Sequence, residues 1–202
     1  MIGIVDYGAG NLFSLKSSIA MIGEEAVVTS DKTMLEKADR IILPGVGAFG
    51  DAAAKLAATG LDREVIRHAK SGKYIMGICL GMQLLFEKSY EYGEHRGLSL
   101  LKGCVKDMRP DIPNGLKIPH IGWNKLEFKK PSPLFKYINE GDFVYFVHSF
   151  YATDCEEAVC AVTEYGTEIT AAVANENVMG CQFHPEKSGK TGLAILKAFC
   201  EL

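Results

Sequence analysis

The chain has 202 residues, of which 48% are apolar and 23% are charged, and its formal net charge is -3. This size and balance are typical of one globular domain, so we expect residues 1–202 to form a single domain. A weakly acidic chain gives no reason to expect binding to nucleic acid or to a membrane surface, and no apolar run has the length that spans a bilayer. Without a basic segment followed by a hydrophobic stretch near residue 1, a cytoplasmic location is expected.

Cysteine is the residue type that most needs an explanation. Six cysteines are scattered along the sequence, at positions 79, 104, 155, 160, 181 and 200. Such scatter, together with the missing secretion signal, argues against a disulfide framework. None of them forms a C-x-x-C pair or has a histidine at metal-ligand spacing, so we expect no metal site and no cofactor. The cysteines other than Cys79 are interpreted as small apolar side chains that pack within strands and helices.

The first half of the chain alternates between strand and helix patterns. Strands are predicted over residues 2–5, 26–28, 39–43 and 74–78. Helices are predicted over residues 11–22, after the glycine-rich segment 44–50 as far as Ala58, over 61–70, and over 80–87. This alternation indicates βαβ units and therefore a parallel sheet.

The second half is richer in strand patterns. Strands are predicted over residues 105–108, 143–150, 158–163, 169–174 and 178–183, and a closing helix over 190–200. Strands that follow one another without helices favour antiparallel pairing. The fold class is therefore expected to be α/β, with a central mixed, mostly parallel sheet that helices flank.

Cys79 stands where the strand 74–78 gives way to a helix. Gly77 and Gly81 flank it at the spacing of a G-x-nucleophile-x-G elbow, with cysteine in place of serine. A turn this tight needs small neighbours, and a helix N-terminus favours thiolate over thiol. The alternative interpretation is a buried small hydrophobe, the usual environment of a single cysteine.

His184 and Glu186 follow the last predicted strand, with Pro185 between them. The fixed φ of proline favours a backbone that projects both side chains to the same side. A histidine base that a carboxylate orients is the pairing that activates a nucleophile. Sites in open α/β sheets form at the carboxyl ends of strands, where Cys79 also lies. A surface turn that places Glu186 at a helix start is the competing interpretation.

The segment 44–50 contains three glycines directly after a strand. Their free backbone N–H groups suit a bound oxyanion. The segment also fits G-x-G-x-x-G, but it does not open the first βαβ unit and lacks the following acidic residue, so nucleotide binding is not favoured. Among the other histidines, His68 and His95 are expected to be solvated, and His120 and His148 receive no role.

Together these three segments resemble the class I glutamine amidotransferases. Residues 44–47 look like the oxyanion strand of that family, residues 77–83 like its nucleophile elbow, and residues 183–186 like its His-x-Glu end. Residues 5–11 and 119–124 are similar to those of the family of glutaminase subunits of imidazole glycerol phosphate synthases, in histidine biosynthesis. The resemblance covers essentially the whole chain.

The resemblance implies a role for each matching residue. Cys79 would attack the side-chain amide of L-glutamine, His184 would serve as base and then acid, and Glu186 would orient it. Other matching positions would hold the oxyanion (Val46, Gly47 and Leu80) or contact the substrate (Gly45, Gln83, Glu91, Ser149 and Phe150). Position 150 is often tyrosine in this family and is phenylalanine here. If the contact there is made through backbone, the change matters little; if it is made through a hydroxyl group, the role passes elsewhere or is lost.

The resemblance also implies a partner, a (β/α)8-barrel cyclase subunit that receives the ammonia and completes a heterodimer. Trp123, Asn124 and Lys187 are the expected interface residues. Alternatives remain at this point: a glutaminase that serves vitamin B6, anthranilate or purine synthesis, a cysteine hydrolase of other specificity, or a binding module without activity.

Overall fold

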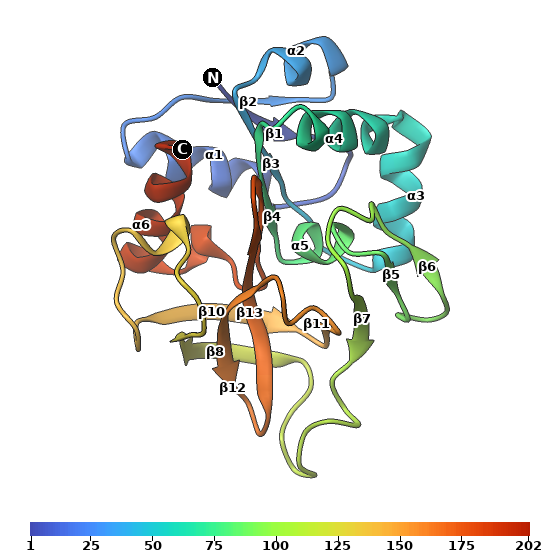
Figure 1. The fold of residues 1–202 in the computed structure, drawn as a ribbon, viewed down its shortest axis with the longest axis vertical. Coiled ribbons are helices and arrows are strands. Elements are labelled where there is room, and N and C mark those ends of the chain that lie inside the picture. The colour runs from blue at the N-terminus through green and yellow to red at the C-terminus, as the bar shows by residue number, and fades with distance from the viewer.

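A computed structural model describes all residues 1–202, and its centre is an eight-stranded sheet (Figure 1). The strand order is β2-β1-β3-β4-β14-β13-β12-β9. The strands are β1 (Ile2–Val5), β2 (Ala26–Thr29), β3 (Arg40–Leu43), β4 (Tyr74–Ile78), β9 (Glu127–Phe128), β12 (Val159–Glu164), β13 (Glu168–Asn175) and β14 (Val178–Cys181). Strands β2, β1, β3, β4 and β14 run parallel, and β13, β12 and β9 add antiparallel pairs. The predicted α/β fold with a mixed sheet is confirmed.

Helices cover both faces of this sheet (Figure 1). Helices α1 (Leu12–Met21) and α6 (Gly189–Cys200) pack on one face; α2 (Lys32–Lys37), α3 (Phe49–Thr59), α4 (Leu61–Lys70) and the short α5 (Leu80–Leu84) pack on the other. The parallel strands alternate between the two cores: in β3, Ile42 faces the first, whereas Ile41 and Leu43 face the second. Burial on both faces explains the continuous apolar runs of these strands.

Two smaller sheets stand beside the main one. Strands β8 (His120–Lys125) and β10 (Phe143–His148) form an antiparallel pair. The second sheet has the order β11-β7-β5-β6 and contains β5 (Lys88–Ser89), β6 (His95–Arg96), β7 (Cys104–Asp107) and β11 (Phe150–Thr153). Single-turn 3₁₀ helices lie at Pro133–Phe135 and Pro185–Lys187. The antiparallel additions therefore extend beyond one sheet.

The expectation of one strand over 143–150 is wrong. The chain leaves the β8–β10 pair after His148 and enters the other sheet at Phe150. Ser149 forms the break between them, and its carbonyl accepts a hydrogen bond from the backbone N–H of Met108 at 3.1 Å. An apolar run carries no mark of a change of partner strand, so the pattern did not reveal this break.

Other differences have local causes. The sequence pattern missed β8 because its apolar Ile121 and Trp123 point outward, 58% and 51% exposed, while the polar His120 points inward. It also missed α2, a helix of six residues with one buried side chain. The last sheet strand ends at Cys181 rather than at Phe183. His68, expected in solvent, is buried on α4, and burial lowers its pKa to about 4.

The turn from β4 into α5 presses against the end of β3. A Cβ atom built on Gly81 would lie 1.8 Å from the carbonyl oxygen of Leu43. One built on Gly77 would lie 2.6 Å from the carbonyl oxygen of Gly81. Both obstacles are backbone atoms of the fold itself, so these positions tolerate only glycine.

We predict that Gly81→Ala destabilises the protein by more than about 3 kcal/mol, because the new methyl group must displace β3. Urea unfolding of the two proteins measures the difference. Gly23→Ala is the matched control: its φ is +83°, but nothing lies within 4 Å of the new methyl group. That variant should lose only about 1–2 kcal/mol, and equal losses in both would contradict the close approach.

Candidate active site

Cys79 occupies a strained backbone position between β4 and α5. Its φ and ψ are 53° and -111°, outside the regions that residues with a side chain ordinarily adopt. Two hydrogen bonds hold it there: its N–H donates to the carbonyl of Cys181 at 2.7 Å, and its carbonyl accepts from the N–H of Gln83 at 3.1 Å. Strain of this kind costs ~1–3 kcal/mol and is concentrated at functional sites.

His184 and Glu186 lie at the end of β14, the strand beside β4. Nδ1 of His184 is 2.8 Å from Oε1 of Glu186, and both side chains are only 3% exposed. His184 is extended, as residues before proline are, and Pro185 starts the 3₁₀ turn that carries Glu186. The N–H of His184 donates to the carbonyl of Tyr145 at 2.9 Å. The carboxylate thus fixes the orientation of the ring.

The electrostatics of His184 fit a proton carrier. Burial alone would lower its pKa, but hydrogen bonds with Cys79 and Glu186 outweigh it and raise the pKa to about 9. A protonated ring at this position can supply the proton that a leaving group needs. Cys79, His184 and Glu186 therefore have the geometry of a nucleophile, a base and the group that orients it.

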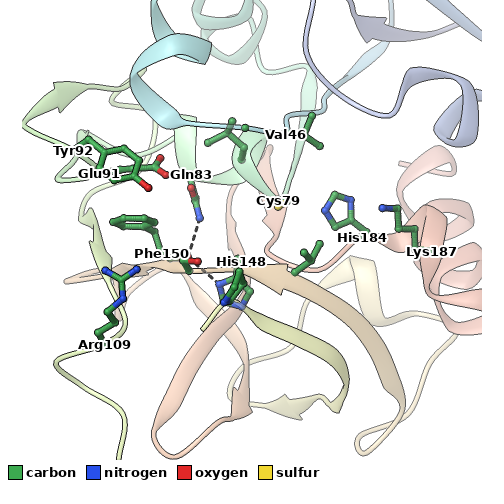
Figure 2. Close-up of a pocket in the computed structure, with 15 residues that line it drawn as sticks. Val46, Cys79, Gln83, Glu91, Tyr92, Arg109, His148, Phe150, His184 and Lys187 are labelled. Atoms are coloured by element: carbon green, nitrogen blue, oxygen red, sulfur yellow. Dashed lines mark hydrogen bonds between the residues drawn. The ribbon is translucent and has the colours of Figure 1, made fainter. Parts of the chain in front are cut away.

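A cavity of about 420 Å³ opens over Cys79 (Figure 2). Its lining combines side chains from β4–α5, β10–β11 and the loop after β3. The lining residues are Val46, Gly47, Cys79, Leu80, Gln83, Glu91, Tyr92, Arg109, Pro119, Val147, His148, Ser149, Phe150, His184 and Lys187. The predicted catalytic cysteine and histidine thus meet most of the predicted substrate and oxyanion positions in one pocket.

The predicted oxyanion residues surround the sulfur. Leu80 is the first residue of α5, so its backbone N–H has no acceptor within the helix. Val46 and Gly47 line the pocket from the loop after β3, where Gly47 has a φ of +97° and Val46 is 45% exposed. Gly45 does not line this pocket: a Cβ atom there would lie 2.7 Å from the backbone nitrogen of Gly81, so its visible role is close packing.

The predicted substrate positions are connected by hydrogen bonds. Nε2 of Gln83 donates to the carbonyl of Phe150 and to Oε1 of Gln182, each at 3.0 Å. Nε2 of Gln182 in turn lies 3.6 Å from the sulfur of Cys79. Glu91 accepts a hydrogen bond from the N–H of Phe49 at 2.6 Å, and burial raises its pKa. These contacts fix the walls of the pocket relative to the nucleophile.

Sequence reasoning missed several residues of the site. His148, Tyr92 and Arg109 line the pocket, and Nε2 of Gln182 lies 3.6 Å from the sulfur of Cys79. Of these residues only His148 stood out in the sequence, as a histidine inside an apolar strand, and the sequence assigned it no function. Arg109 lies in a loop that none of the three motif segments includes, so no motif indicated it. Its guanidinium group pairs with the carboxylate of Asp107 at 2.9 Å.

The predicted interface residues have different environments. Trp123 is half exposed and packs edge-on against Tyr145, with ring centroids 6.0 Å apart. Nζ of Lys187 lies 5.9 Å from the same Tyr145 ring and reaches the rim of the pocket. The Asn124 side chain is turned inward, toward His120 and the carbonyl of Glu164. Trp123 and Lys187 thus share one exposed face, and Asn124 does not present its amide there.

Three further observations concern metals, membranes and thiols. No group of three or more potential metal ligands occurs in the structure, and no helix is long and apolar enough to cross a membrane. All six cysteines are unpaired and buried.

Comparison with known proteins assigns the chain to a family. Residues 3–201 match the family "Glutamine amidotransferase class-I". A crystal structure of a glutamine amidotransferase has the same fold, with a TM-score of 0.77 and 21% identity over 99% of this chain and 97% of that one. PurLQS from Thermotoga maritima has a TM-score of 0.76 and 23% identity, with the same coverage. The chain belongs to the class I glutamine amidotransferases.

Its curated relatives narrow the comparison. The imidazole glycerol phosphate synthase subunit HisH of Caldanaerobacter subterraneus is 52% identical over all of this chain and 98% of that protein. The subunit of the same name from Aquifex aeolicus is 50% identical over 97% of this chain and 94% of that protein. The chain thus resembles these subunits over their full length.

We predict that Glu186→Gln lowers the pKa of His184 from about 9 toward its ordinary value of 6.5, as a ring-proton NMR titration measures. Because the folded pKa lies above the unfolded one, the pair stabilises the fold fully below pH 6.5, and this stabilisation is lost as the pH rises through 9. The difference in free energy of unfolding between the wild type and Glu186→Gln should therefore become smaller as the pH rises from 6.5 to 9. Glu168→Gln, which removes an exposed pair with Lys129, should leave the His184 titration unchanged. An unaltered titration in Glu186→Gln would contradict the pairing.

Proposed function

We propose that this protein is the glutaminase subunit of imidazole glycerol phosphate synthase in histidine biosynthesis, with residues 1–202 acting as one domain. The observation that carries the proposal is the buried Cys79, His184 and Glu186 array under a pocket, in a chain that is about half identical to such subunits over their full length. The reaction hydrolyses L-glutamine to L-glutamate and ammonia. A cytoplasmic setting follows from this biosynthetic role and from the six unpaired thiols.

The chemistry begins with attack of the Cys79 sulfur on the side-chain amide carbon of glutamine. The tetrahedral intermediate collapses when His184 gives a proton to the departing nitrogen, which releases ammonia and leaves a thioester. Water then attacks the thioester carbonyl, and His184 takes its proton. Glutamate departs and the thiolate is restored. Glu186 holds the ring and stabilises its charged form throughout both halves of the reaction.

Charge that develops on the amide oxygen needs donors. We assign this role to the N–H of Leu80, free at the start of α5, and to the backbone of Val46 and Gly47 across the pocket. Donors of this kind contribute ~3–4 kcal/mol to the barrier in hydrolases of similar chemistry. The positive φ of Gly47 gives this loop a backbone direction that few other residues adopt.

The amino-acid end of glutamine would lie toward Gln83, Glu91 and Phe150, on the far side of the pocket from His184 (Figure 2). Ser149, next to Phe150 in the chain, also lines the pocket. The carboxylate of Glu91 suits the substrate ammonium group. Phe150 has no hydroxyl group, so its contribution falls to its backbone. Free N–H groups of an irregular segment such as that at Ser149 suit the substrate carboxylate.

The ammonia would pass to a (β/α)8-barrel cyclase subunit, which forms imidazole glycerol phosphate and an aminoimidazole carboxamide ribotide. The exposed face around Trp123 and Lys187 supports a docking site there, because exposed aromatic side chains, Trp above all, are enriched at the centres of interfaces. Lys187 also lines the pocket. A partner on this face would therefore lie next to the site where ammonia is released.

We predict that Cys79→Ala lowers glutamine hydrolysis at least ~10³-fold, while cyclase activity with added ammonia survives in the assembled enzyme. Removal of the nucleophile ends thioester formation but leaves the partner intact. A coupled glutamate assay and an ammonia-supplied cyclase assay measure the two activities. Cys104→Ala is the matched control, a buried cysteine outside the pocket, and should retain both. Retained glutamine hydrolysis in Cys79→Ala would refute the proposed function.

We predict that Trp123→Ala weakens binding of the cyclase subunit at least tenfold, with little change in thermal stability, because the ring is half exposed and its loss leaves no cavity. Isothermal titration calorimetry with the purified cyclase measures the affinity. Phe13→Ala removes an aromatic ring that is 84% exposed on α1 and serves as the control. Equal affinities for both variants would place the interface elsewhere.

A further inference from the structure

A buried network of hydrogen bonds links the pocket to the β8–β10 pair, and the proposed chemistry makes no use of it. Nδ1 of His148 lies 2.9 Å from the carbonyl oxygen of Phe150, and its Nε2 lies 3.2 Å from Nδ1 of His120. Nε2 of His120 lies 2.9 Å from Oδ1 of Asn124, whose Nδ2 donates to the carbonyl of Glu164 at 2.9 Å. We call His148, His120 and Asn124 the buried network.

The two rings are held in place by packing as well as by hydrogen bonds. His120 is 1% exposed and is stacked between Phe146 and Tyr165, with centroid distances of 5.0 and 4.0 Å. His148 is 7% exposed and is edge-on to His120. Rings packed in this way have one available orientation, so the hydrogen bonds they make are fixed in direction.

At the pocket, the network ends in a hydrogen bond to one carbonyl group, that of Phe150 (Figure 2). The oxygen of Phe150 accepts from Nδ1 of His148 and also from Nε2 of Gln83, at 2.9 and 3.0 Å. Two side-chain donors therefore hold the Phe150 carbonyl at the point where the chain changes from one sheet to the other. Ser149 and Phe150, the residues at this change, line the pocket.

We propose that His148 and His120 are positioning residues for glutamine: they hold the Ser149–Phe150 backbone in the orientation that binds the amino-acid end of the substrate. This inference rests on the proposed function, which puts glutamine against that backbone. Neither ring takes part in proton transfer, because burial lowers the pKa of both, to about 3 for His148. A ring that stays neutral is a fixed donor and acceptor rather than an acid.

The donors in the network can be counted. It ends on a carbonyl oxygen at both ends, and a carbonyl only accepts. Each neutral ring brings one donor and one acceptor nitrogen, and the Asn124 amide brings one donor nitrogen and one acceptor oxygen, so three donor atoms serve four contacts. The Asn124 end of the network reaches an exposed carbonyl, that of Glu164, where solvent can supply the missing donor, so the proposal places the shortage at that end. With Nδ1 of His148 donating to Phe150 and Nδ1 of His120 donating to Nε2 of His148, the proposal implies the Nδ1–H tautomer at both histidines.

The experiment compares two substitutions of one residue, in glutaminase assays with the cyclase subunit present. His148→Phe removes the donor to Phe150, whereas His148→Asn places an amide N–H near the position of Nδ1. We expect a KM for glutamine at least tenfold higher in His148→Phe with kcat within about threefold, and a KM within about threefold of wild type in His148→Asn. His120→Phe should raise KM less, because it removes the second contact from the pocket.

His68→Phe is the matched control, since His68 is a buried histidine on α4 that does not line the pocket. It should change thermal stability without changing KM. Imidazole ¹⁵N shifts at pH 7 provide a readout independent of activity: Nδ1–H is expected at His148, and an Nε2–H tautomer there overturns the proposal. An unchanged KM in His148→Phe, or an equal rise in His148→Asn, overturns it as well. A wild-type enzyme without glutaminase activity overturns the proposed function and this inference with it.

Discussion

The site depends on how closely the β4–α5 turn packs against the end of β3. The position of a Cβ atom on Gly81 is 1.8 Å from the Leu43 carbonyl oxygen, so helix and strand meet backbone to backbone. This approach gives α5 its direction, and the direction places Cys79 at a positive φ with its sulfur facing the pocket. The hydrogen bond from Cys79 to Cys181 then ties the strained residue to β14. The fold thus compensates the strain of the nucleophile through contacts that any larger residue at position 81 would break.

The same sheet order brings the base to the nucleophile. Strands β4 and β14 are neighbours and parallel, so their carboxyl ends coincide although Cys79 and His184 are far apart in sequence. The rule that sites form at these ends made the pairing of the two residues predictable from motifs alone. The structural role of Gly77 and Gly81 was also predictable, because a tight turn from strand to helix demands small residues. Contacts that no sequence motif indicates were not predictable. Gln182 and Arg109 reach the site only through tertiary packing.

Strand β8 was the hardest strand to predict from the sequence, and it contributes both to the proposed interface and to the buried network. β8 reverses the usual pattern, with Ile121 and Trp123 outside and His120 inside. Sequence reasoning expects apolar side chains to face the core, so it found no strand over 120–125. In the structure this reversal has two results. The outward aromatic ring gives the strand a face suited to a partner, and the inward His120 gives it a buried contact with His148, which lines the pocket. The feature that concealed the strand is therefore the one that connects it to function.

Two buried histidines of the pocket show how partners decide what burial does. Burial lowers the pKa of any imidazole that lacks a compensating charge. His184 faces Cys79 and the Glu186 carboxylate, and its pKa rises to about 9; His148 faces a neutral carbonyl and another ring, and its pKa falls to about 3. One ring is therefore charged and the other neutral at the same pH and in the same cavity. A proton on His148 would also repel the one on His184. Keeping the positioning histidine neutral thus preserves the charge that the catalytic histidine needs.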